Sequence, residues 1–203
     1  MIGIVDYGVG NIKAFSNIYK NLNLDYRVLQ SKYDFVGVDK LILPGVGSFD
    51  HAMLSLQNSG MFDILNEYVL NQNIPVIGIC VGMQMLANSS EEGKLHGLGW
   101  INGTVKKFSK IDIANLPLPH MGWNNINIEK NNSILKNLEY DAKFYFLHSY
   151  YFECEDKNNI LAASSYGKKF DSIINSDNIY GIQCHPEKSH SNGIQLLKNF
   201  GEL

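Results

Sequence analysis

A cysteine lies between two glycines where an apolar run ends, in the segment 78–82, Gly-Ile-Cys-Val-Gly. When a strand turns sharply into a helix, the residue at the turn is exposed, and flanking glycines relieve the crowding. Free N–H groups and the helix dipole at such a helix start stabilise a thiolate, and the N–H of Val81 would face a developing oxyanion. The segment predicts a nucleophilic Cys80. The alternative is a buried structural cysteine on a glycine-rich turn.

A histidine and a glutamate stand two residues apart after another apolar run, in the segment 185–187, His-Pro-Glu. A cysteine nucleophile needs a base, and the base needs a group that orients it. His185 is the candidate base, and Glu187 is the candidate acceptor for its other ring nitrogen. Because both segments follow predicted strands, and open parallel sheets gather their sites at the carboxyl ends of strands, we expect Cys80 and His185 to meet.

A glycine-rich loop follows a third strand-like run, in the segment 43–49, Leu-Pro-Gly-Val-Gly-Ser-Phe. Backbone N–H groups of such a loop can point at a developing negative charge. An ordinary turn is the other interpretation of this segment.

The elements that must position these segments alternate along the first half of the chain. Strand-like runs are expected at 2–5, 26–29, 40–43 and 75–79, and amphipathic helices at 11–22, 53–71 and 81–87. After about residue 95, short strand-like runs are expected at 100–101, 104–108, 125–128, 143–147, 151–153, 161–165, 172–175 and 180–184, before a closing helix at 193–200. This order predicts an α/β domain with a mixed, mostly parallel central sheet flanked by helices.

Composition narrows the class of protein. A length of 203 residues with 45% hydrophobic content predicts one domain, 1–203, with a packed core. A net charge of -3, with Arg27 as the single arginine, argues against nucleic-acid binding. Three cysteines without a C-x-x-C pair, no signal peptide and no apolar run of membrane-spanning length lead us to expect a reduced, cytoplasmic protein. No group of residues has the spacing of metal ligands, so no metal site is expected.

Six segments in a fixed order carry a family resemblance. They are Asp-Tyr-Gly-Val-Gly-Asn at 6–11, the loop at 43–49, Gly-Ile-Cys-Val-Gly-Met-Gln at 78–84, His-Met-Gly-Trp-Asn at 120–124, Phe-Tyr-Phe-Leu-His-Ser-Tyr at 144–150 and His-Pro-Glu-Lys-Ser at 185–189. Over nearly the whole chain they resemble the class I (triad) glutamine amidotransferases. The first, second and fourth segments point to one subfamily, the glutaminase subunits of imidazole glycerol phosphate synthase in histidine biosynthesis. The resemblance implies a three-layer, flavodoxin-like fold and no cofactor.

The resemblance also implies a reaction and its residues. Cys80 would attack the glutamine side-chain amide to form a γ-glutamyl thioester, His185 would transfer protons, and Glu187 would hold His185. The implied oxyanion hole uses N–H groups of Val81 and of the Val46-Gly47 peptide. The implied glutamine-binding residues are Gly47, Gln84, Ser149 and Tyr150.

A partner is implied as well. The family's acceptor reaction needs a (β/α)₈ barrel synthase (cyclase) of about 250 residues, for which 203 residues leave no room. A heterodimer with a separate barrel subunit is therefore expected. The positions that match the family's interface and gate are Asn11, Trp123, Tyr145 and Lys188. Trp123 could instead be a core aromatic residue and Lys188 a solvated charge.

Three departures from the family pattern leave other interpretations open. Val81 stands in place of the usual leucine, Cys184 in place of a common phenylalanine, and Ala14 in place of a small polar residue. A paralogue that supplies ammonia for surface-polysaccharide sugars fits these residues too. The glutaminase subunit of pyridoxal phosphate synthase, with a Pro-Gly-Gly loop, fits less well. The remaining alternatives are a stand-alone cysteine hydrolase and a catalytically silent regulatory or binding subunit.

Overall fold

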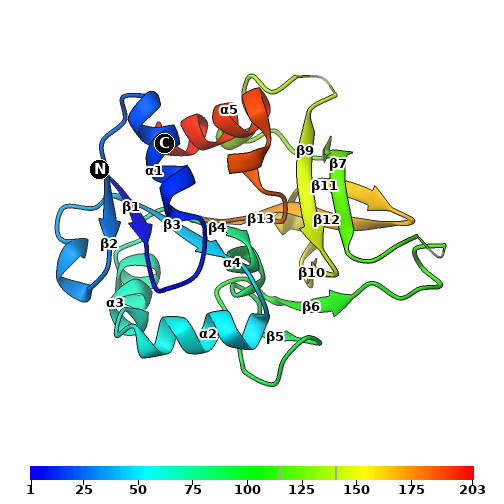
Figure 1. The fold of residues 1–203 in the computed structure, drawn as a ribbon, viewed down its shortest axis with the longest axis horizontal. Coiled ribbons are helices and arrows are strands. Elements are labelled where there is room, and N and C mark those ends of the chain that lie inside the picture. Colours follow the sequence, from blue (N-terminus) through cyan, green and yellow to red (C-terminus); the bar gives the residue numbers. More distant parts are fainter. Residues whose placement is uncertain (115, 140) are drawn as a thin grey trace.

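An eight-stranded sheet in the order β2-β1-β3-β4-β13-β12-β11-β8 crosses the centre of the molecule (Figure 1). The structure is a computed structural model that describes residues 1–114, 116–139 and 141–203. The pairs from β2 to β13 are parallel, and those from β13 to β8 are antiparallel. The mixed, mostly parallel sheet expected from the sequence is confirmed.

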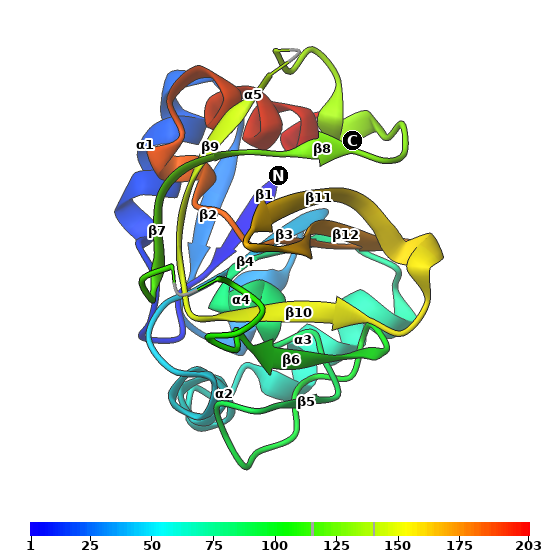
Figure 2. The same ribbon diagram turned by 90° about the vertical axis from the view of Figure 1, so that its right-hand side faces the viewer.

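The strands of this sheet are β1 (Ile2–Val5), β2 (Tyr26–Leu29), β3 (Lys40–Gly45), β4 (Val76–Cys80), β8 (Asn127–Ile128), β11 (Ile160–Tyr166), β12 (Lys168–Ser176) and β13 (Ile179–Ile182). A smaller sheet contains β5 (Ser89–Ser90), β6 (Gly103–Lys107) and β10 (Tyr150–Cys154), and a two-stranded ribbon pairs β7 (His120–Asn125) with β9 (Lys143–His148). Figure 2 shows β10 and β6 beneath β11 and β12, at the antiparallel end of the central sheet.

Helices cover both faces of the parallel half, which gives the expected three layers. They are α1 (Ile12–Asn21), α2 (Phe49–Asn58), α3 (Phe62–Asn66), α4 (Val81–Gln84) and α5 (His190–Gly201). Figure 1 shows α1 and α5 on one side of the sheet and α2 and α3 on the other. The Tyr19 hydroxyl of α1 donates to the carbonyl of Leu197 in α5 at 3.1 Å, which ties the first layer together. Strands β1 and β4 are buried along their whole length because both faces are covered.

Several predicted elements differ from the observed ones. The single helix expected over 53–71 is instead α2, α3 and a π-helical turn (Glu67–Asn71), because Gly60 adopts a left-handed conformation with φ +73°. No strand forms at 100–101, where the Trp100 indole donates to Asn66 Oδ1 at 2.8 Å. The run expected at 125–128 captures only the end of β7 and the short β8. The last strand, β13, ends at Ile182, before the segment that carries His185.

None of the helices in the described part of the chain has both the length and the apolar character that a membrane span requires.

Candidate active site

Cys80 occupies a strained turn between β4 and α4. Its φ of 56° and ψ of -112° place a non-glycine residue outside the regions that L-amino acids favour. The strand that ends at Cys80, β4, lies between β3 and β13 in the central sheet, and Val81 begins the helix at the next residue. The predicted strand-to-helix turn is therefore present, with the side chain of Cys80 at its apex.

Three glycines make this turn sterically feasible. A Cβ atom on Gly78 would lie 2.5 Å from the carbonyl oxygen of Gly82. A Cβ atom on Gly82 would overlap the carbonyl oxygen of Leu43, and one on Gly45 would overlap the backbone nitrogen of Gly82. The end of β3 and the start of α4 thus approach so closely that no side chain fits between them.

We expect Gly82→Ala to disrupt the turn. Because the added methyl group meets backbone rather than a flexible side chain, relief requires β3 or α4 to move, at a cost of about 1–3 kcal/mol in unfolding free energy. Urea unfolding and an activity assay measure the two effects. Gly60→Ala is the control, because that glycine has open space around its missing Cβ and lies at the end of α2. It should lose stability from its positive φ and keep activity. Wild-type stability and activity in Gly82→Ala would contradict the steric role of this glycine.

His185 lies beside Glu187 in a buried ion pair. The His185 Nδ1 and Glu187 Oε1 atoms are 3.0 Å apart, and the two side chains are 6% and 3% exposed. The His185 N–H donates to the carbonyl of Tyr145 at 2.8 Å, and the Ser189 hydroxyl donates to the carbonyl of His185 at 2.6 Å. The imidazole is therefore fixed by its backbone and by a carboxylate, which leaves Nε2 for another partner.

That partner is Cys80. Burial alone would lower the pKa of His185, but hydrogen bonds to Cys80 and Glu187 and the negative charges of both raise it overall. The imidazolium is thereby stabilised next to a cysteine sulfur, as an ion-pair mechanism requires. The structure thus brings together Cys80, His185 and Glu187, as the sequence predicts.

A cavity of about 360 Å³ opens above these residues. Its lining includes each residue expected from the sequence for the oxyanion hole and for glutamine: Val46, Gly47, Val81, Gln84, Ser149 and Tyr150. The volume suits a small-molecule ligand.

The glycine-rich loop is held at both ends. The Tyr7 hydroxyl donates to the carbonyl of Pro44 at 2.6 Å, and the Phe49 N–H at the start of α2 donates to the Glu92 carboxylate at 2.8 Å. Between these anchors Gly47 has a φ of +86°. The Tyr7 contact gives a physical role to the segment 6–11, which faces the loop across the end of β1.

Gln84 has a fixed amide orientation. Its Nε2 donates to the carbonyl of Tyr150 and to Gln183 Oε1, each at 3.1 Å. The side-chain oxygen of Gln84, Oε1, is left to accept from a ligand. Gln183 is fully buried, and its Nε2 lies 4.0 Å from the Cys80 sulfur. The run 180–184 is expected from the sequence only as a strand, which gives Gln183 no role.

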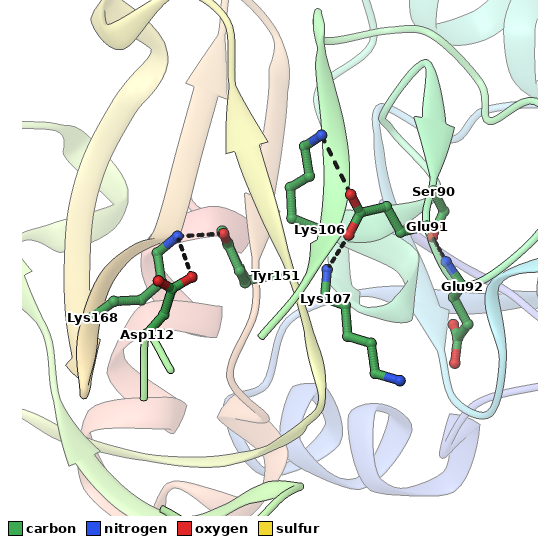
Figure 3. A network of polar contacts seen from close by, with 8 residues as sticks. All are labelled: Ser90, Glu91, Glu92, Lys106, Lys107, Asp112, Tyr151 and Lys168. Atoms are coloured by element: carbon green, nitrogen blue, oxygen red, sulfur yellow. Dashed lines mark hydrogen bonds and ion pairs between the residues drawn. The ribbon is translucent and has the colours of Figure 1, made fainter. Parts of the chain in front are cut away.

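Glu92 lines the cavity, and the sequence analysis gave it no role. Its segment is held against β6, as Figure 3 shows: Glu91 accepts from the Lys107 N–H at 2.7 Å and pairs with Lys106 at 3.5 Å. The Glu92 N–H donates to the Ser90 hydroxyl at 3.1 Å. An acidic residue five positions beyond the helix predicted at 81–87 was the available signal, but an exposed surface pair explains that sequence equally well.

Three of the four residues expected at the interface gather beside the cavity. Trp123 is 47% exposed and contacts the Tyr145 ring edge-on at 6.1 Å, and the Lys188 ammonium lies 5.7 Å from the centre of that ring. Trp123 is therefore not a core residue, and Lys188 lines the cavity. Asn11 lies apart from this group, on a separate small cavity that Glu187 also lines.

The other two cysteines have the buried surroundings of structural residues. Cys184 is fully buried, and burial raises the pKa of its thiol, as it does for Cys154. Within residues 1–114, 116–139 and 141–203, no group of three or more His, Cys, Asp or Glu side chains is arranged to hold a metal ion.

Comparison with known proteins places the chain in a family. The model of the family described as glutamine amidotransferase class-I matches residues 3–202. The chain is 53% identical over 205 residues to the imidazole glycerol phosphate synthase subunit HisH of Leptospira borgpetersenii, with 100% of both chains covered. It is 52% identical over 204 residues to the protein of the same name from Bdellovibrio bacteriovorus, again with 100% of both covered.

Solved structures support the fold. A protein described as part of a putative GMP synthase, from Thermoplasma acidophilum, superposes with a TM-score of 0.73 at 21% identity, covering 99% of this chain and 92% of the other. A structure described as a glutamine amidotransferase gives a TM-score of 0.74 at 18% identity, covering 99% and 97%.

Proposed function

The chain belongs to the class-I glutamine amidotransferase family, and from this premise we propose that it is the glutaminase subunit of an imidazole glycerol phosphate synthase. It hydrolyses glutamine to glutamate and ammonia and delivers the ammonia to a separate (β/α)₈ barrel synthase subunit. The observation that carries the chemistry is Cys80 on its strained turn, next to the His185–Glu187 pair, in a cavity of amino-acid size.

The reaction proceeds through a thioester. Cys80 Sγ attacks the side-chain carbonyl carbon of glutamine while His185 holds the thiol proton, and the C–N bond breaks as His185 gives that proton to the departing ammonia. His185 then removes a proton from water, whose oxygen attacks the thioester, and the C–S bond breaks to release glutamate. Glu187 keeps the imidazole oriented and stabilises its positive charge.

The oxyanion is bound by backbone groups. The Val81 N–H lies directly after the nucleophile at the start of α4, and the Val46-Gly47 peptide lines the same cavity. The contacts from Tyr7 to Pro44 and from Phe49 to Glu92 support this role because they anchor the loop that carries the peptide.

The cavity offers complementary groups for glutamine. The side-chain Oε1 of Gln84 is free to accept from the substrate, and Ser149 and Tyr150 offer backbone groups. Glu92 supplies a carboxylate for the α-ammonium group of an amino acid. The nucleophilic thiol needs a reducing compartment, in agreement with a cytoplasmic complex.

The barrel subunit docks at the cavity mouth. Trp123, Tyr145 and Lys188 form a contiguous group there, and Met121 and Leu147 add apolar surface that is 64% and 36% exposed. An exposed apolar patch of this kind is typical of a protein interface. Asn11 is the fourth contact and the first residue before α1.

Reconstitution with barrel synthases tests this function. We expect the chain to form a 1:1 complex with the barrel synthase of histidine biosynthesis from the same organism and to hydrolyse glutamine faster in that complex than alone. Analytical ultracentrifugation and glutamate release measure the two results. A complex only with a barrel from a sugar-modification cluster would favour the paralogue, and full turnover by the isolated chain would favour a stand-alone hydrolase. Failure of a diazoketone analogue of glutamine to modify Cys80 in either complex would indicate a silent subunit.

A further inference from the structure

Two histidines face each other on the β7–β9 ribbon next to the active-site cavity. His120 and His148 are direct cross-strand partners, and both are buried, with exposures of 3% and 6%. The His120 Nδ1 and His148 Nε2 atoms are 2.9 Å apart. His148 lines the same cavity as Cys80 and His185, yet the proposed reaction gives it no step.

At one end of the histidine pair, the partner is a group that can only accept a hydrogen bond. The His148 Nδ1 atom lies 2.8 Å from the carbonyl oxygen of Tyr150. Because a carbonyl has no proton to give, Nδ1 of His148 carries the hydrogen. In the neutral ring Nε2 is then an acceptor, so His120 must donate to it from Nδ1. The Nε2 atom of His120 is left as an acceptor in turn.

The other end is held by a group that donates. Asn124 Nδ2 lies 3.2 Å from His120 Nε2 and also donates to the carbonyl of Ser165 at 2.8 Å. The orientation of this amide is fixed independently, because its Oδ1 accepts from the N–H of Asn125 at 2.9 Å. The series from Asn124 through His120 and His148 to Tyr150 therefore has a single direction, set at both ends by backbone groups.

We propose that His120, His148 and Asn124 are positioning residues, whose one-way hydrogen-bond chain holds the Tyr150 carbonyl and with it the glutamine-binding backbone at 149–150. The Tyr150 carbonyl also accepts from Gln84 Nε2 at 3.1 Å, so the chain fixes the amide of Gln84 as well. The inference rests on the proposed function, because it assigns these residues to the glutamine pocket of that site. It explains why His120 and Asn124 stand four apart in the segment 120–124: alternation along β7 places them on one face.

The surroundings of His120 and His148 keep both imidazoles of this hydrogen-bond chain uncharged. Burial lowers the pKa of His120 to about 4. Burial also lowers the pKa of His148 to about 3, helped by the charges of His120 and His185 and opposed by the hydrogen bond to Tyr150. The other titratable ring against the pair is Tyr166 of β11, which stacks on His120 at 4.1 Å. Phe146 of β9 and Phe170 of β12 supply apolar neighbours. Both imidazoles are therefore neutral near pH 7, and proton transfer is left to His185.

Reversing one donor tests the proposal. Asn124→Asp keeps the size and the Oδ1 acceptor for the Asn125 N–H, but it replaces the donor to His120 with a carboxylate oxygen. The only way to satisfy that oxygen is a proton on His120 Nε2, so the histidine pair should take up a proton and titrate at higher pH. In the complex with the synthase, we expect the KM for glutamine to rise about tenfold, the equivalent of about 1.4 kcal/mol, with a smaller change in kcat. The KM should also become pH-dependent between about pH 5 and 8.

Asn125→Asp is the matched control. It makes the same change of charge one residue along, at a side chain that donates to the carbonyl of Asp141 and contacts neither histidine. We expect it to leave the KM for glutamine and its pH dependence as in the wild type.

Nitrogen NMR of the imidazoles separates this inference from the proposed function. The wild type should show both rings neutral with the proton on Nδ1 at pH 7, and Asn124→Asp should show a doubly protonated ring. Protons on Nε2 in the wild type, or a wild-type KM in Asn124→Asp, would overturn the inference. A wild-type complex without glutaminase activity would overturn both the proposed function and the role of these residues in the glutamine pocket. The tautomers would still show whether the hydrogen-bond chain from Asn124 to Tyr150 is present.

Discussion

Cys80→Ala is expected to abolish glutamine-dependent synthesis by the complex and to leave ammonia-dependent synthesis intact. The variant removes the sulfur atom that forms the thioester in the proposed reaction, so glutamine hydrolysis should fall by about 10⁴-fold or more. Added ammonium salt bypasses that step, because the acceptor reaction of the proposed complex takes place in the barrel subunit. Product formation with glutamine and with ammonium salt, measured on the same preparation, checks both statements.

The packing around Cys80 makes this variant a clean test. The β-carbon of Cys80 remains in Cys80→Ala. The alanine is smaller than cysteine and adopts the same strained backbone conformation. Cys154→Ala is the matched control, because Cys154 is another buried cysteine and lies at the opposite end of β10 from the cavity residue Tyr150. It should keep both activities at some cost in stability. Loss of ammonia-dependent synthesis in Cys80→Ala would contradict separate sites, and retention of glutamine hydrolysis would contradict the nucleophile.

His185→Ala and Glu187→Gln should differ in severity in a defined order. Removing the imidazole removes the proton carrier for every step, whereas Glu187→Gln keeps the base and loses its orientation and charge partner. We expect His185→Ala to reduce kcat by about 10⁴-fold or more, and Glu187→Gln to be about one to two orders of magnitude less severe. Single-turnover hydrolysis of glutamine in the complex measures both.

The pH profile of Glu187→Gln adds a second readout. The negative charge of Glu187 is one of the causes that raise the pKa of His185, so its removal should move that pKa down. The limb of the pH–rate profile that reports His185 should therefore shift to lower pH. An unchanged profile, or a Glu187→Gln defect as large as that of His185→Ala, would show that Glu187 acts in another way.

The fold was predictable to the extent that its determinants are local. The strands 2–5 and 26–29 coincide with β1 and β2, and the turn at 78–82 follows from glycines that no other residue could replace. The prediction of a single helix over 53–71 was wrong because the apolar repeat continues across Gly60. Periodicity alone does not reveal that one residue adopts a left-handed conformation. Most of β7 was missed because its pattern is interrupted at Gly122, which has a φ of +131°.

The residues of the candidate site also fall into two groups, those that could be predicted from the sequence and those that could not. Cys80, His185 and Glu187 were named from residue types and spacing at the ends of strands. Glu92, Gln183 and the role of His148 were not, because each depends on segments that meet only after folding: Glu92 with Phe49, Gln183 with Cys80, His148 with His120. The spacing of residues within one segment cannot indicate a contact between two distant segments.

The amino-acid sequence alone determined the chemistry available to this protein: a cysteine on a glycine-flanked turn, a histidine with its carboxylate, and a chain that alternates strand and helix. Steric and periodic constraints of this kind act within a few residues, so they can be recognised without coordinates. Tertiary structure decided which groups complete the pocket. The register of β7 against β9 places His120 opposite His148, and the loop after β5 brings Glu92 to the first turn of α2. These choices depend on the packing of distant segments into one close-fitting interior, which is a property of the whole chain.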